Sequence, residues 1–144
     1  SGWWCNALGL CSAMKIWGLA IGSVCVMASS AFAQAPIFSA EQVARGKAAY
    51  IQRCGMCHGE NLDDGDFGGA PLRGTWFRDH WGAGSVAALF SYVKTTMPPD
   101  NPGGLNDTTY ADILTYILQR NGYAAGQDEL KPDEKSMESM SLQK

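Results

Sequence analysis

The feature that most constrains this chain is the run Cys54-Gly55-Met56-Cys57-His58, in which two cysteines lie three positions apart and a histidine follows the second. Residues i and i+3 of a helical turn face the same side, so both thiols can add to the two vinyl groups along one edge of a porphyrin. His58 then projects toward the iron as an axial ligand. C-x-x-C-H is the attachment pattern of a c-type haem. Its single occurrence predicts one haem c, covalently bound by Cys54 and Cys57.

Three other interpretations of this run compete with haem attachment. A redox dithiol places C-x-x-C beside a βαβ pattern, and no such pattern is visible here. A structural zinc site needs four ligands; after residue 33 the chain offers Cys54, Cys57, His58 and His80, and the adjacent pair 57–58 would chelate awkwardly. A chance coincidence requires three specified rare residues to fall together. Haem attachment is the interpretation we favour.

Residues 14–33 have the pattern of a secretory signal peptide. Lys15 supplies a short positive region, residues 16–28 form an uncharged apolar run, and residues 31–33 have the small-x-small form of a cleavage site. An uncleaved N-terminal anchor is the alternative, because signals and anchors share their apolar core, but the run is short for a membrane span. We therefore expect export to the periplasm and no membrane attachment after cleavage.

This pattern divides the chain into four expected parts. Residues 1–13 are an artefact upstream of the true start, and residues 14–33 are the signal peptide. Residues 34–126 form one haem-binding domain. Residues 127–144 form a polar C-terminal tail, which we expect to be weakly ordered.

Composition narrows the class of protein further. Hydrophobic residues make up 46% and charged residues 17% of the chain, which excludes a disordered protein. A net charge of -3 without a basic cluster excludes nucleic acid as a partner. The 17 glycines among 144 residues predict many turns and loops. A small, loop-rich domain is marginally stable unless something cross-links it, and covalent haem would provide that link.

Local signals predict an all-α fold. Residues 39–42 read as a capping box that begins a helix running to about Arg53 and into the haem turn. Seven glycines between positions 59 and 84 indicate a loop rather than a strand.

Two further helices follow. Ser85 caps one that must end just before Met97, because the residue before a proline is disfavoured in a helix. Asn106 or Asp107 caps the last, and Gly122 is its expected C-terminal stop. We expect three to five short helices around one covalently bound haem.

The ligand on the opposite face of the iron decides what the haem does. The candidates are Met97, His80, Met137, Met140 and Met56. Met56 lies inside the attachment turn and cannot reach around the ring, and Met137 and Met140 lie in the tail. Met97 precedes two prolines and would be presented from an extended loop. His80 as a second histidine ligand, or a Met97 that only fills the core, remain the alternatives.

These features resemble class I c-type cytochromes, which bind one haem through histidine and methionine, over roughly residues 39–130. Gly46 and Tyr50 match the small residue and the aromatic that precede the haem motif, and Tyr116 matches the aromatic that packs against them. The resemblance implies a small cytochrome c fold with His58 and Met97 as axial ligands.

Two more residues are expected near the haem. Pro71 matches the proline after the haem loop, and the resemblance implies that its carbonyl accepts a hydrogen bond from Nδ1 of His58. Trp81 is one of the aromatic residues that could line the ring.

A finer pattern is similar to the cytochrome subunits that serve pyrroloquinoline-quinone alcohol dehydrogenases. It comprises residues 96–99, 102–105, 110–114 and 121–123. The resemblance implies a one-electron carrier, not itself an enzyme, which accepts electrons from a dehydrogenase and passes them toward a terminal oxidase. Its expected partners are a quinoprotein dehydrogenase, a terminal oxidase or another cytochrome. We expect the protein itself to be a monomer or a loosely bound subunit.

Two other functions remain open at this point. In a haem enzyme or gas sensor the distal ligand would be weak or absent, and His80 or Arg78 could act as the distal acid or base. In a structural subunit the haem would mainly support folding.

Overall fold

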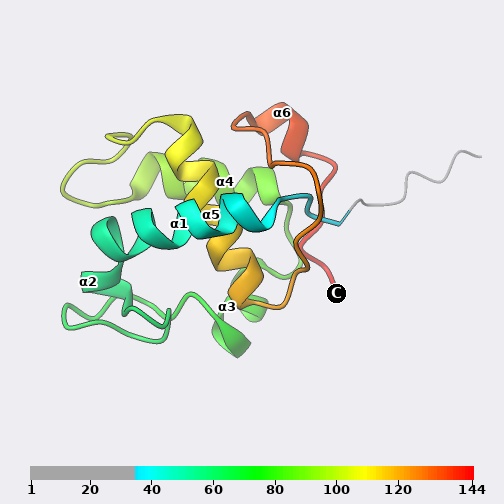
Figure 1. Ribbon diagram of the computed structural model, residues 1–144. Helices are drawn as coiled ribbons and strands as arrows, with labels where there is room; N and C mark the ends of the chain where they lie inside the picture. The colour runs from blue at the N-terminus through cyan, green and yellow to red at the C-terminus, as the bar shows by residue number, and fades with distance from the viewer. Residues whose placement is uncertain (1–34) are drawn as a thin grey trace, which may run out of the picture. The chain divides into compact units, whose positions relative to one another are not determined.

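The computed structural model describes residues 35–144, so the expected artefact segment 1–13 and the signal peptide 14–33 lie outside the described residues. Within this part the chain forms six helices, and its only β pairing consists of two isolated bridges (Figure 1). The predicted all-α fold is confirmed. The helices outnumber the three to five expected because two of them are single turns of four residues. No helix among the described residues has the length and apolar character to cross a membrane.

Helices α1 (Ala40–Arg53) and α5 (Asp107–Arg120) form the centre of the domain. They cross in contact with each other, as Figure 1 shows in cyan and orange. Gly46 lies at the crossing, and a Cβ there would collide with the backbone carbonyl of Asp112. The close approach of the two helices therefore requires glycine at position 46, as the resemblance implied.

The predicted N-terminal caps are all present. Side-chain oxygens of Ser39, Ser85 and Asn106 accept hydrogen bonds from backbone N–H groups three residues later, at 3.1, 3.2 and 2.8 Å. Each such cap is worth about 1 kcal/mol of stability. Helix α4 (Val86–Thr96) ends at Met97, whose backbone is extended, as its position before a proline predicts. Gly122, with φ of 82°, stops α5.

Helix α3 (Gly74–Trp81) corrects the prediction that residues 59–84 form only a loop. Its side chains Phe77 and Trp81 stand four positions apart and so share one helix face. Phe77 is buried and Trp81 packs against the core. The glycines on either side of this helix made its short apolar pattern hard to recognise in the sequence. The pattern stabilises the helix only when its side chains pack against the rest of the domain.

The last 18 residues correct a second expectation. This C-terminal strap (residues 127–144), which we expected to be a weakly ordered tail, packs on the domain and includes the short helix α6 (Glu134–Met137) beside α4. Its side chains Leu130, Met137, Met140 and Leu142 are buried in the core. The N–H of Val86 donates to the carbonyl of Met140 at 2.9 Å, and the N–H of Leu142 donates to the carbonyl of Gly84 at 3.0 Å. The few apolar side chains of a mostly polar segment all face inward.

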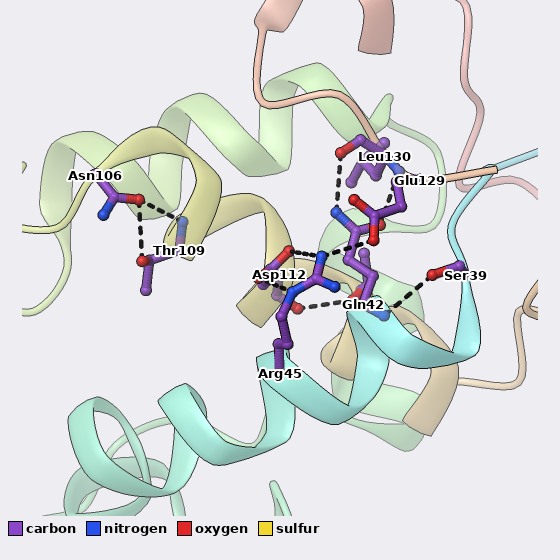
Figure 2. Close-up of polar contacts among 9 residues, drawn as sticks. Ser39, Gln42, Arg45, Asn106, Thr109, Asp112, Glu129 and Leu130 are labelled. Carbon is purple, nitrogen blue, oxygen red and sulfur yellow. Dashed lines mark hydrogen bonds and ion pairs between the residues drawn. The ribbon is translucent and has the colours of Figure 1, made fainter.

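Polar side chains of α1 hold the start of the strap (Figure 2). The Gln42 amide donates to the carbonyl of Leu130 at 2.9 Å and accepts from its N–H at 2.7 Å. Gln42 was expected to complete a capping box with Ser39, but its side chain bonds the strap instead. Arg45 reaches Asp112 of α5 at 2.9 Å and Glu129 of the strap at 2.8 Å.

Candidate haem site

The two cysteines and His58 share one helical turn. Helix α2 (Gly55–His58) begins directly after Cys54, and the N–H groups of Cys57 and His58 donate to the Cys54 carbonyl at 3.1 and 2.9 Å. Both cysteines are unpaired thiols and half-buried. Burial, and to a lesser degree the nearby Cys57, raises the pKa of the Cys54 thiol to about 11. Cys54 is therefore held as a neutral thiol near pH 7.

The ring of His58 is oriented by the loop that follows it. Its Nδ1 lies 2.7 Å from the backbone carbonyl oxygen of Ala70. A carbonyl can only accept, so in the neutral ring Nδ1 carries the proton and Nε2 keeps its lone pair. Nε2 has no hydrogen-bond partner among residues 35–144. In this state Nδ1 is held by its hydrogen bond and Nε2 is available to bind a metal.

The acceptor corrects the residue that the resemblance implied. The carbonyl is that of Ala70, one position before Pro71. The loop is fixed in this register because the N–H of Gly69 donates to the carbonyl of Cys57 at 2.8 Å. A Cβ at Gly69 would collide with that same carbonyl, so only glycine allows the loop to lie this close to the turn.

Two tyrosine hydroxyls hold the backbone directly after His58. Tyr50 of α1 donates to the carbonyl of Gly59 at 2.8 Å, and Tyr116 of α5 makes a longer contact of 3.4 Å with the carbonyl of Glu60. Their rings pack with centroids 5.3 Å apart, as the resemblance implied. Burial, followed by smaller effects of nearby groups, raises the pKa of the Tyr50 phenol above its ordinary value. The resemblance implied the packing of these rings but not the role of the hydroxyls.

Met97 is half-buried at the end of α4, and both of its backbone groups are bonded. Its N–H donates to the carbonyl of Val93 at 2.9 Å, and its carbonyl accepts from the hydroxyl of Tyr110 at 2.8 Å. The loop that follows Met97 and helix α2 lie at the same end of α1, the left end in Figure 1. The chain thus brings the haem turn and the Met97 loop to one end of the domain.

The other candidate ligands are placed differently. His80 is exposed on α3, where its ring stacks on Trp76 with centroids 3.8 Å apart and its Nδ1 lies 2.8 Å from the Trp76 carbonyl. Met56 is 68% exposed. Met137 and Met140 are buried in the strap. None of these four has the half-buried position and extended backbone of Met97.

The two residues expected near the haem are both half-buried. Pro71 follows the Ala70 carbonyl that holds His58. Trp81 lies at the end of α3, and its ring is tilted by 57° against that of Tyr92, 5.1 Å away. Tyr92 is 47% exposed and was not singled out from the sequence.

The side chains present are suited to a c-type haem. Two free thiols lie on one helical turn and are followed by an imidazole with a free Nε2. In the described residues, no three His, Cys, Asp or Glu side chains gather in a way that could hold a bare metal ion.

Comparison with known proteins places this geometry in a family context. Residues 41–117, just over half of the chain, match the family described as "Cytochrome C oxidase, cbb3-type, subunit III". Thiosulfate dehydrogenase of Stutzerimonas stutzeri (strain A1501) is 31% identical over 83 residues, which cover 52% of this chain and 26% of that protein. No solved structure matches the chain. The family match contains both cysteines, His58 and Met97, whereas the C-terminal strap lies beyond it.

Proposed function

Since this chain belongs to the class I c-type cytochromes, in the family of the cbb3-type oxidase subunit III, we propose that it is a periplasmic carrier of single electrons. Proteins of this class bind haem and transfer electrons. The haem supplies a one-electron Fe(III)/Fe(II) couple when bound. In this proposal Cys54 and Cys57 attach one haem, and His58 and Met97 are its axial ligands.

The observation that supports the proposal most directly is the bond between His58 and Ala70. The carbonyl fixes the proton on Nδ1, which leaves Nε2 as the iron ligand and increases its basicity. The two thiols lie on the same turn as the imidazole, which is the arrangement that attachment of one porphyrin requires.

Met97 is the residue that would make the protein a carrier rather than an enzyme. A thioether and an imidazole on the iron leave no open position for a substrate, and thioether ligation favours the reduced state. The extended backbone at Met97 and its half-buried position support this role.

The proposed donor is a dehydrogenase and the proposed acceptor a terminal oxidase or another cytochrome. Residues 96–99 and 110–114 support a quinoprotein dehydrogenase as the donor. The relative named thiosulfate dehydrogenase, of which the aligned stretch is 26%, supports a dehydrogenase more generally. The family description supports an oxidase as acceptor.

Optical spectra of the purified holoprotein test the axial ligands. We expect a six-coordinate, low-spin spectrum with an iron–methionine charge-transfer band when oxidised, and no response of the reduced protein to carbon monoxide. Met97→Ala should abolish the band, lower the potential and allow carbon monoxide to bind. Met56→Ala, which removes a methionine that is 68% exposed, is the matched control and should change none of these.

The opposite result would point to another function. A high-spin spectrum of the unmodified protein, or one that shifts with carbon monoxide, would contradict the carrier proposal and favour a haem enzyme or gas sensor.

A separate experiment tests the proposed donor. The oxidised protein is mixed with a reduced quinoprotein dehydrogenase, and failure of the haem to become reduced would exclude that donor.

A further inference from the structure

Tyr110 holds the backbone of Met97 from the neighbouring helix. It is the fourth residue of α5, its side chain is 1% exposed, and its hydroxyl donates to the Met97 carbonyl at 2.8 Å. Because Met97 follows the last residue of α4, its carbonyl is the first on the chain beyond that helix. The bond from Tyr110 therefore fixes the point at which the chain leaves α4.

The burial of Tyr110 makes this bond hard to break. A buried phenol that loses its partner pays the full cost of desolvation, which exceeds the net gain of making the bond. Movement of the Met97 segment away from α5 would leave the hydroxyl in that state. The fold thus opposes such movement, even though the loop after Met97 is largely exposed.

A second contact joins the same two helices but should matter less. Lys94 of α4 pairs with Asp107 of α5 at 2.8 Å, three residues before Met97. Both side chains are about a third to a half exposed, and ion pairs of this kind contribute little because solvent screens them. The hydroxyl of Tyr110 is the stronger of the two restraints.

We propose that Tyr110 is a positioning residue that keeps the distal ligand segment in place by its bond to the Met97 carbonyl. The inference rests on the proposed function, in which the Met97 side chain binds the iron. In this role Tyr110 acts through the Met97 backbone rather than through the Met97 sulfur. The bond lowers the population of states in which the Met97 segment has moved away from α5. The Tyr50 hydroxyl on Gly59 does the equivalent for the segment after His58.

Tyr110→Phe tests this inference, because it removes the hydroxyl and leaves the buried ring. The readout is the carbon monoxide affinity of the reduced holoprotein, since carbon monoxide binds only when Met97 has left the iron. The net value of one hydrogen bond corresponds to an increase of about two-fold to ten-fold in this affinity. Tyr123→Phe is the matched control: its hydroxyl also donates to a backbone carbonyl, that of Leu142 in the strap, and its loss should leave the affinity unchanged.

A double-mutant cycle separates positioning from general loosening. Tyr110→Phe added to Met97→Ala should have no further effect on carbon monoxide affinity. An equal increase in both backgrounds, or an affinity of Tyr110→Phe no higher than that of Tyr123→Phe, would overturn the inference while leaving Met97 as the ligand. If the unmodified protein already binds carbon monoxide as Met97→Ala does, the ligand assignment and the inference both fail.

A measurement on the unmodified protein makes the test independent of any variant. In the reduced holoprotein the hydroxyl proton of Tyr110 should exchange slowly enough with water to be seen by NMR, because it is buried and bonded. Rapid exchange of this proton would show that the bond is not maintained and would overturn the inference.

Discussion

Gln42→Ala should be one of the most destabilising single substitutions in α1, because Gln42 is a buried polar residue that is 1% exposed. The Gln42 amide makes two buried hydrogen bonds to the backbone of Leu130, at 2.9 and 2.7 Å (Figure 2). Its truncation leaves both the N–H and the carbonyl of Leu130 buried without these partners, at about 1–3 kcal/mol each. We therefore expect a loss of about 2–6 kcal/mol, a large share of the roughly 5–15 kcal/mol by which a domain is stable.

The assay is equilibrium guanidinium unfolding of the holoprotein, followed by far-ultraviolet circular dichroism. Gln52→Ala is the matched control, because Gln52 is an exposed glutamine on the same helix. That change should alter the free energy of unfolding by no more than about 0.5 kcal/mol. If Gln42→Ala lowers the free energy of unfolding no more than Gln52→Ala does, the strap does not depend on the Gln42 amide and the reasoning is refuted.

Two further predictions concern the helix crossing and the buried phenol. Gly46→Ala should cost about 1–3 kcal/mol in guanidinium unfolding, because its Cβ collides with the Asp112 carbonyl; Gly126→Ala, where a Cβ meets nothing within 4 Å, should cost far less, and equal losses would contradict the packing argument. Burial raises the pKa of Tyr50, so the folded protein keeps a proton that the unfolded chain releases above about pH 10, and stability should fall there by up to about 1.4 kcal/mol per pH unit from this group. Tyr50→Phe should reduce that slope while Tyr92→Phe, at an exposed position, should not; an unchanged slope in Tyr50→Phe would show that another group is responsible.

The helix boundaries could be predicted because their signals are local. Ser39, Ser85 and Asn106 bond N–H groups only three residues away. The proline after Met97 acts on its immediate neighbour. Such signals can be recognised without knowledge of the tertiary structure. The helical turn at Cys54–His58 was likewise predicted from a local sequence pattern.

The features that escaped prediction depend on contacts between distant segments. Gln42 has the spacing of a capping box, yet its partner lies 88 residues later in the chain. The shift from Pro71 to Ala70 depends on how Gly69 packs against Cys57, which no pattern within the loop reveals. Tyr110 and Tyr50 look like ordinary core aromatics at helical spacing, because a hydroxyl's acceptor is visible only in three dimensions.

The distance in sequence between Gln42 and Leu130 also sets an order of events in folding. Helix α1 and the haem turn are made before the segment that satisfies the Gln42 amide, because Leu130 follows Gln42 by 88 residues. Loop closure over 88 residues must precede the gain from those two bonds. Until that loop has closed, the Cys54 and Cys57 thiols lie on a domain whose strap is not yet docked, and they are accessible to their surroundings before the strap packs on α1.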